Sequence, residues 1–286
     1  MLERAVGLDS TYAPAWAALA LRYYIDSDYA GGGEAIMKRS DAAAERALAL
    51  DPNFIAAGAQ LSRNRVERGE LTKAYHEAED LVRRRPDNAE AHFTLSYVLR
   101  YAGLLQESAN QCDTALSLDP ANFRWRSCAD VFLQRGDYQR AMNYLRLDLG
   151  SEYYKARSID ALVRTGKEKE ALQIGPPDIA NWRARYALLL ACAGHRPLPE
   201  IATLASSVQP EEDPEDNYFL AAHLAYCGQT ETALKMLGRA IGGNYCSYPA
   251  IDSDPLFASI RRKPEFGEVR SAAISCQKKF LAERGQ

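Results

Sequence analysis

The stretch AEAHFTLSYVLRYAGLLQESANQCDTALSLDPAN, residues 89–122, contains the pattern that decides the fold of this chain. Its apolar residues recur every three or four positions in two successive runs, which is the spacing of helices with one buried face. Gly103 lies between the two runs, and Pro120 follows the second. Because glycine readily ends a helix and proline cannot continue one, this stretch is predicted to form two helices joined by a tight turn.

The same pattern recurs along the chain with a period of 34 residues. Pro52, Pro86 and Pro120 are each 34 residues apart, and they occur in the similar phrases ALALDPNF, VRRRPDN and LSLDPAN. Gly69 and Gly103 have the same separation. A fixed period of roughly 20–50 residues is typical of arrays in which each unit buries its apolar face against the next.

Two motifs link this repeat to a known family. Trp16-x2-Leu19-Ala20-x2-Tyr23 resembles the W-x2-L-G-x2-Y signature of tetratricopeptide repeats, and residues 74–78 resemble its A-x3-F half. The resemblance covers nearly the whole chain and implies an all-α fold, a right-handed α-solenoid of stacked helix-turn-helix hairpins with a C-terminal pair of capping helices. The predicted repeats are 13–54, 55–88, 89–122, 123–151, 152–179, 180–213 and 214–247, with part of a truncated repeat at 1–12 and capping helices at 248–286.

The two ends of the chain indicate its context. Residues 1–12 match only the second helix of a repeat, as found at 45–52, so we expect a longer natural protein upstream. The phrase YPAIDSDPLFASIRRKPEF at 248–266 resembles the ends of repeat regions in large bacterial regulators. In those proteins the repeats follow a serine/threonine kinase, a cyclase or a winged-helix DNA-binding domain. The resemblance implies that this chain is the sensory or docking arm of such a regulator.

The first repeat has 42 residues instead of 34, and the surplus is predicted to lie in an enlarged turn, IDSDYAGGG at 25–33. A phosphate-binding loop would need a Gly-Lys-Ser/Thr ending, which this stretch lacks. A calcium loop would need oxygen ligands where Ala30 and Met37 stand. The glycines are therefore predicted to form a flexible connection and not a ligand site.

The composition argues against several classes of function. A net charge of −3 gives no field that would favour nucleic acid or an anionic membrane, and no apolar stretch is long enough to span a bilayer. The four histidines form no metal-binding pair, and hydrolase, kinase and dinucleotide-binding motifs are absent. We therefore predict a protein without catalytic residues, metal or cofactor. A small-molecule-sensing repeat domain and a hydrolase hidden in a helical array are the alternatives.

The six cysteines are widely spaced and form no Cys-x-x-Cys motif. A chain of 286 residues can bury a large core without covalent cross-links, and free cysteine is among the most buried residue types. The cysteines are therefore predicted to be reduced and mostly buried. This favours the cytoplasm, with the periplasm as the alternative if a membrane segment lies upstream.

The candidate site follows from the family resemblance, which implies that the first helices of successive repeats line a concave groove that holds peptides. Helical spacing places Phe93, Tyr97 and Arg100 on one face of such a helix, and the repeat register adds positions from neighbouring helices. The predicted peptide-binding residues are Arg63, Phe93, Tyr97, Arg100, Arg126, Asp130, Asp160 and Arg164. Since arginine and aromatic side chains are common interface anchors, the expected partner is a protein or peptide with an acidic or aromatic segment.

Some of these charges have a structural alternative. Ion pairs across neighbouring helices could form between Arg100 and Asp130 and between Arg126 and Asp160. Such pairs would leave less unpaired charge to bind a partner. The acidic run EEDPED at 211–216 precedes an apolar helical stretch. Because negative charges stabilise the N-terminus of a helix, this run is predicted to be structural.

Overall fold

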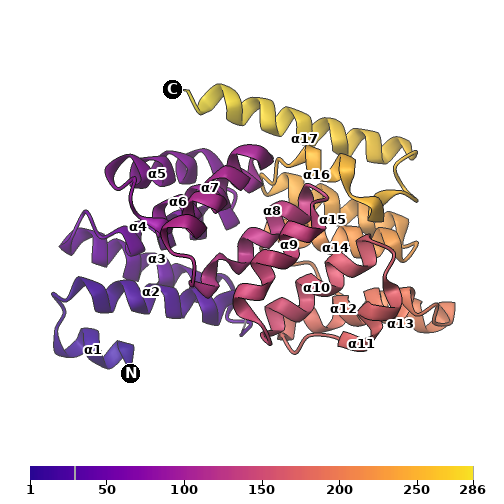
Figure 1. Cartoon of the computed structure of the whole chain (residues 1–286), viewed down its shortest axis with the longest axis horizontal. Coiled ribbons are helices and arrows are strands. Elements are labelled where there is room, and N and C mark those ends of the chain that lie inside the picture. Colours follow the sequence, from indigo (N-terminus) through magenta and orange to yellow (C-terminus); the bar gives the residue numbers. More distant parts are fainter. Residues whose placement is uncertain (29, 286) are drawn as a thin grey trace.

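The computed structural model describes residues 1–28 and 30–285, and every regular element within these residues is a helix (Figure 1). The α-helices are α1 (Leu2–Leu8), α2 (Ala13–Asp28), α3 (Gly33–Leu50), α4 (Ile55–Glu67), α5 (Leu71–Arg84), α6 (Ala89–Tyr101), α7 (Leu105–Leu118), α8 (Ala129–Gln134), α9 (Tyr138–Leu145), α10 (Glu152–Arg164), α11 (Glu168–Ile174), α12 (Ala180–Ala193), α13 (Leu198–Ser207), α14 (Pro214–Tyr226), α15 (Thr230–Gly242), α16 (Tyr248–Ser253) and α17 (Pro264–Glu283). Short 3-10 helices are η1 (Phe123–Cys128), η2 (Arg146–Asp148) and η3 (Pro255–Phe257). Successive helices pack as hairpins, so the prediction of an all-α solenoid of helical hairpins is confirmed.

Small side chains allow the two helices of a hairpin to approach closely. Ala74 and Ala78 of α5 are fully buried. Between α6 and α7, the Ser108 hydroxyl donates a hydrogen bond to the carbonyl oxygen of Ser96 at 2.7 Å. Because each hairpin also packs on the next, one cluster of buried apolar residues extends through the array from Val66 to Phe280.

Glycine ends the first helix of several hairpins, as the repeat pattern predicts. Gly69 and Gly103 have φ angles of +81° and +72°, in the left-handed region that other residues adopt only with strain. At Gly103 a side chain would also lack room, because a Cβ atom would lie 2.6 Å from Gln277 Nε2 and 2.8 Å from Ser247 Cα. Glycine at this turn therefore permits both the end of α6 and the close approach of a distant part of the chain.

The first hairpin differs from its prediction. α2 continues to Asp28 and α3 begins at Gly33, so the surplus residues lengthen the helices, and the prediction of an enlarged turn is wrong. α2 and α3 contain 16 and 18 residues, against 13 and 14 in α4 and α5. An ion pair between Arg22 and Asp26, 2.6 Å apart at the i,i+4 spacing, stabilises the additional length of α2. Tyr29, which belongs to the predicted turn, lies outside the described residues.

The array closes on itself, because its C-terminal part returns to the second and third hairpins (Figure 1). The backbone N–H of Cys246 donates to the carbonyl oxygen of Tyr101 at 2.7 Å. Gln277 Nε2 of α17 donates to the carbonyl oxygen of Ala102 at 2.9 Å. α17 therefore contacts α5 as well as α15 and α16, and it does more than cover the last hairpin.

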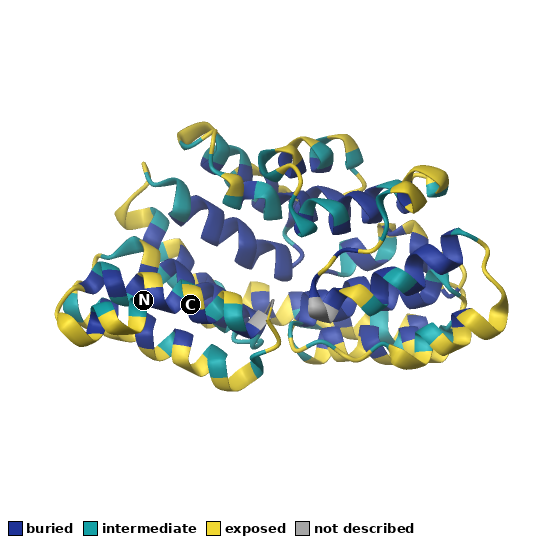
Figure 2. Cartoon of the chain, turned by 90° about the horizontal axis from the view of Figure 1, so that it is seen from below, coloured by how far each residue is buried: buried dark blue, intermediate teal, exposed yellow. Residues whose placement is uncertain are grey.

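α14 occupies the inside of this closed array. All of its residues from Pro214 to Ala225 are buried. Figure 2 shows the longest runs of buried residues on the inner helices, while the outer helices alternate between buried and exposed residues. Its side chains reach several first helices at once: Glu215 contacts Arg100 of α6, and His223 contacts Asp160 of α10. The concave face is therefore largely filled by the chain itself.

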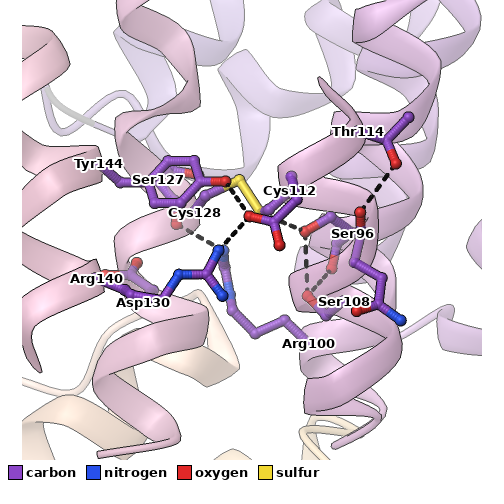
Figure 3. Close-up of a disulfide and its surroundings, with 12 residues drawn as sticks. Ser96, Arg100, Ser108, Cys112, Thr114, Ser127, Cys128, Asp130, Arg140 and Tyr144 are labelled. Carbon is purple, nitrogen blue, oxygen red and sulfur yellow. Dashed lines mark hydrogen bonds and ion pairs between the residues drawn. A yellow bond between two sulfur atoms is a disulfide. The ribbon is translucent and has the colours of Figure 1, made fainter. Parts of the chain in front are cut away.

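The cysteines form three disulfides, Cys112–Cys128, Cys192–Cys227 and Cys246–Cys276, so the prediction of reduced cysteines is wrong. The first lies between α7 and η1, where the Ser96 hydroxyl is 2.9 Å from Cys112 Sγ (Figure 3). The paired cysteines are separated by 16, 35 and 30 residues along the chain. Such distances bring side chains together only after neighbouring hairpins have stacked, which is why short cysteine motifs did not reveal the pairs.

Candidate functional site

A cleft of about 160 Å³ lies on the inner face of the array, and we name it the aromatic cleft. Its walls come from α2, α4, α6, η1, α8, α10, α12 and the beginning of α14. The lining residues are Leu21, Tyr24, Ile25, Arg63, Phe93, Tyr97, Arg100, Phe123, Arg124, Arg126, Ser127, Asp130, Tyr153, Arg157, Trp182, Asp213, Glu215 and Asp216.

The predicted site residues divide into two groups. The aromatic cleft brings together six of the eight, which are Arg63, Phe93, Tyr97, Arg100, Arg126 and Asp130. Asp160 and Arg164 lie outside it, because η3 and α14 cover their part of the concave face. Arg164 Nη1 lies 2.8 Å from Asp160 Oδ1, and its Nη2 lies 2.8 Å from Asp254 Oδ2 at the start of η3.

The arginines of the cleft are paired within the chain, although not as the sequence suggested. Arg100 donates to both carboxylate oxygens of Glu215, with Nε and Nη2 at 2.7 and 2.6 Å. Arg126 Nε lies 3.1 Å from Asp148 Oδ2. Both arginines are therefore paired within the chain, as the structural alternative suggested, but with Glu215 and Asp148 in place of Asp130 and Asp160. Glu215 is 115 residues from Arg100 in the sequence, so no local spacing could have identified it.

The remaining charges at the cleft are also matched. Arg63 Nη1 and Arg124 Nη1 lie 2.7 and 2.8 Å from the two carboxylate oxygens of Glu90. Asp130 Oδ1 lies 2.9 Å from Arg157 Nε, and its Oδ2 accepts a hydrogen bond from Tyr153 at 2.9 Å. Each of these arginines therefore already faces a carboxylate.

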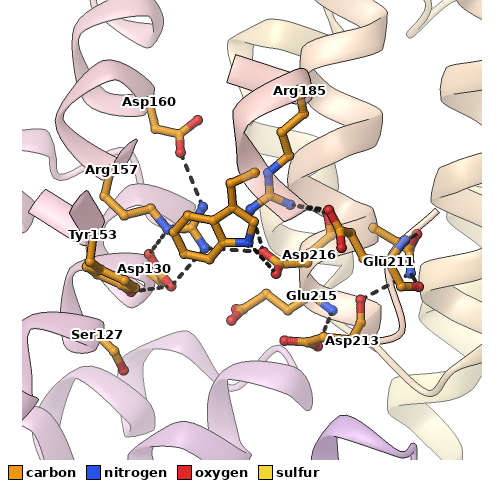
Figure 4. A network of polar contacts seen from close by, with 12 residues as sticks. Ser127, Asp130, Tyr153, Arg157, Asp160, Arg185, Glu211, Asp213, Glu215 and Asp216 are labelled. Atoms are coloured by element: carbon orange, nitrogen blue, oxygen red, sulfur yellow. Dashed lines mark hydrogen bonds and ion pairs between the residues drawn. The ribbon is translucent and has the colours of Figure 1, made fainter. Parts of the chain in front are cut away.

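The acidic run at 211–216 supplies several of these partners (Figure 4). Asp213 caps α14 by accepting a hydrogen bond from the backbone N–H of Glu215 at 2.8 Å, so this residue of the run has the role at a helix N-terminus that was predicted. Asp216 Oδ1 lies 2.8 Å from Arg185 Nη2 and 3.5 Å from Arg157 Nη2. Of the arginines that suggested an acidic partner, Arg100 thus holds a carboxylate of this run, while the others pair with carboxylates elsewhere in the chain.

The deepest charges form a network around Asp160 on α10. Burial alone would raise the pKa of Asp160, but His223, Arg164 and Arg157 hold that pKa well below its usual range. Burial lowers the pKa of His223, whose Nε2 lies 2.7 Å from Asp160 Oδ1. Tyr186 donates to the other oxygen of Asp160 at 2.5 Å. Asp160 therefore joins α10 to α12 and α14 and supports the wall of the cleft from behind.

A second cavity, of about 810 Å³, adjoins the aromatic cleft, and we name it the acidic cavity. Asp213 and Asp216 line both spaces. Among its lining residues are six carboxylates and two guanidinium groups, namely Glu34, Glu67, Glu211, Glu212, Asp213 and Asp216 against Arg68 and Arg239. Burial raises the pKa of Glu67 and that of Glu211 from 4.5 to about 7.

The sequence had not indicated several residues of the cleft. Phe123, Tyr153 and Trp182 supply rings from the fourth, fifth and sixth predicted repeats, which are shortened or degenerate. The repeat register was too loose there to place single side chains. Their aromatic character was the only available signal, and in a helical repeat it usually marks a core position.

Two features of other protein classes are not found in the described part of the chain. Among residues 1–28 and 30–285, no group of three or more His, Cys, Asp or Glu side chains is arranged to hold a metal ion. None of the described helices combines the length and the apolar composition that crossing a bilayer requires.

Comparison with known proteins identifies the fold. No protein-family model matches the sequence, and no curated protein is similar to it in sequence. Among solved structures, the thermophilic TPR protein TTC0263 of Thermus thermophilus aligns over 61% of this chain and 97% of its own, with a TM-score of 0.52 and 20% identity. The fold is that of the tetratricopeptide repeat proteins.

Two further structures share the tetratricopeptide repeat fold. A tetratricopeptide repeat protein from Parabacteroides merdae ATCC 43184 aligns over 91% of this chain and 98% of its own, with a TM-score of 0.50 and 12% identity. A chain of the APC/C hetero-tetramer Cut9-Hcn1 aligns over 97% of this chain and 56% of its own, with a TM-score of 0.56 and 14% identity. At these identities the likeness concerns the fold.

Proposed function

We propose that this tetratricopeptide repeat chain is a non-catalytic scaffold that binds a segment of a partner protein at the aromatic cleft. The observation that carries the proposal is the apolar rim of that cleft. Phe123 of η1 is 53% exposed and Ile25 of α2 is 38% exposed, although both are large apolar residues. An exposed apolar rim beside a cleft is typical of a protein-binding surface.

The predicted site residues take different roles in this proposal. Phe93 and Tyr97 present aromatic surface to the bound segment, while Arg63, Arg100, Arg126 and Asp130 shape the walls through their ion pairs. Asp160 and Arg164 act from behind the wall, since they are buried in the network around α10. No nucleic acid is expected as a partner, because the chain has a net charge of −3.

The cleft volume supports a second candidate, a domain that senses a small molecule. A dry cavity of about 150 Å³ can hold a benzene molecule, so the aromatic cleft is large enough for a compound of one ring. The exposed rim favours the protein segment, because a small ligand would leave Phe123 and Ile25 in contact with water.

The setting of the chain is also part of the proposal. We place it as the sensory or docking arm of a larger bacterial regulator, on the resemblance of residues 248–266 to the ends of such repeat regions. The disulfides favour the periplasmic alternative over the cytoplasm, since disulfides persist in oxidising compartments. Thiol labelling in source cells, with and without prior reduction, tests this location. Labelling without reduction would place the protein in a reducing compartment.

Affinity capture tests the scaffold proposal. The protein is used to capture partners from an extract of source cells, and each partner is then divided into overlapping peptides. We expect one short segment to bind, and Phe123→Ala combined with Ile25→Ala to weaken it by roughly tenfold or more. The matched control replaces Leu149 and Leu198, which are 67% and 80% exposed and do not line the cleft. Undiminished binding to a folded cleft variant would refute the proposal.

A further inference from the structure

The ion pairs at the aromatic cleft disfavour a bound segment with acidic side chains. Arg100 is 1% exposed and is held by Glu215, which also accepts a hydrogen bond from Gln134 at 2.6 Å. Arg63 and Arg124 share the carboxylate of Glu90. An acidic side chain entering the cleft would therefore lose its hydration and compete with carboxylates that are already in place.

The rings of the cleft offer a different complement. Phe93 and Tyr97 of α6 lie with their ring centroids 6.3 Å apart, edge to face. Tyr153 of α10 and Trp182 of α12 form a second pair at 5.8 Å. A volume of about 160 Å³ between such rings suits a single aromatic side chain, which gains both burial and ring contacts.

The acidic cavity adds a preference for charge. Six carboxylates and two guanidinium groups line it. Arg185, which does not line the cavity, pairs with Asp216 and lies 3.7 Å from Glu211, so these two carboxylates are partly compensated. Arg68, one of the two lining arginines, pairs with Asp41 outside the cavity, with Nη1 2.5 Å from Oδ2. The raised pKa of Glu67 and that of Glu211 reflect the cost of holding negative charge there. A cation entering this space would lower that cost. Because Asp213 and Asp216 line both spaces, a segment anchored in the cleft has the cavity beside it.

We propose that the segment bound by this chain carries an aromatic residue with a lysine or arginine a few positions away. The aromatic ring fills the aromatic cleft, and the cationic side chain enters the acidic cavity. This inference rests on the proposed function. It keeps the aromatic segment, one of the two kinds expected from the sequence, and replaces the acidic kind by a basic side chain.

A random peptide library displayed on phage and selected on the full chain tests the inference. We expect the enriched sequences to contain an aromatic residue with lysine or arginine nearby. Enrichment of acidic sequences, or of sequences without aromatic residues, would overturn the inference and leave the scaffold proposal standing. If no sequence were enriched over selection on the Phe123→Ala and Ile25→Ala variant, both would fail.

Charge variants separate the two halves of the inference. Glu34 and Glu212 line the acidic cavity and are exposed, so Glu34→Gln with Glu212→Gln should leave the fold intact. This variant should bind a labelled aromatic-basic peptide from the selection roughly threefold to tenfold more weakly, and the loss should shrink at high salt. Glu231→Gln with Glu268→Gln makes the same change of net charge at exposed positions away from the cavity. Equal effects of the two variants would overturn the basic part of the inference.

Discussion

Removing the charge of Arg100 should strongly destabilise the closed array. The Arg100→Met variant keeps an unbranched apolar side chain beside Tyr97, whose ring centroid lies 4.4 Å from the guanidinium carbon. It leaves the Glu215 carboxylate without its bidentate partner, at a site where the two side chains are 1% and 4% exposed. An isolated buried charge of this kind costs about 3–5 kcal/mol, so the free energy of unfolding should fall by that amount.

The size of the effect depends on Glu215 keeping its charge, and a double-mutant cycle tests that reasoning. Glu215→Gln alone leaves Arg100 charged and buried, and should also cost about 3–5 kcal/mol. The double variant contains neither charge, so its loss should be smaller than the sum of the two single losses by more than about 1 kcal/mol. The amide oxygen introduced by Glu215→Gln can still accept the hydrogen bond from Gln134, which is 2.6 Å long in the parent protein.

Urea unfolding followed by tryptophan fluorescence and circular dichroism measures these free energies. The control is Arg22→Met in the exposed pair with Asp26, where the side chains are 59% and 32% exposed. Its loss should not exceed about 1 kcal/mol. Single losses no larger than this control, or strictly additive losses in the double variant, would refute the argument that Arg100 and Glu215 join α6 to α14 as a desolvated pair.

Other changes should alter stability in measurable ways. Gly136→Ala, at φ +71° in open space, should lower the free energy of unfolding by roughly 1–2 kcal/mol in urea titrations, whereas Gly103→Ala should cost more because its Cβ would also lie 2.6 Å from an α17 side chain. Replacing Cys246 and Cys276 together by Ser should cost about 2–4 kcal/mol without reductant, and the difference from the parent should shrink when the parent is reduced. The pKa of Glu67 rises from 4.5 to about 7 on folding, so the folded state holds its proton more tightly. Stability should therefore decline as pH rises from 4.5 to 7, and Glu67→Gln should reduce that slope in thermal melts at several pH values.

Helical periodicity correctly predicted which face of α6 lines the candidate site. Phe93, Tyr97 and Arg100 were assigned to the inner face of α6 from their spacing, and all three line the aromatic cleft. Asp160 and Arg164 were assigned in the same way to α10, but η3 and α14 cover them. The spacing of residues on one helix defines a face, and it contains no information about which later segment will pack on that face.

The enlarged first repeat also shows that local sequence patterns do not reveal how the chain packs. The sequence indicated surplus residues between 13 and 54, and the structure contains them. Their distribution between helix and turn depended on whether α2 could continue past Tyr24. That continuation is supported by Arg22 and Asp26 and by the packing of Tyr24 and Ile25 beside the cleft, which a repeat consensus does not describe.

The sequence by itself determined the repeating hairpin, because its causes are local. Apolar residues at helical spacing, glycine at the turn and proline after the second helix act within about one repeat length, so they can be read along the chain. Only the tertiary structure decided that Arg100 meets Glu215, that Cys246 meets Cys276, and that α14 fills the concave face. These contacts depend on the curvature accumulated over many repeats. Small rotations between neighbouring hairpins add up along the array, and their sum determines which distant segments meet.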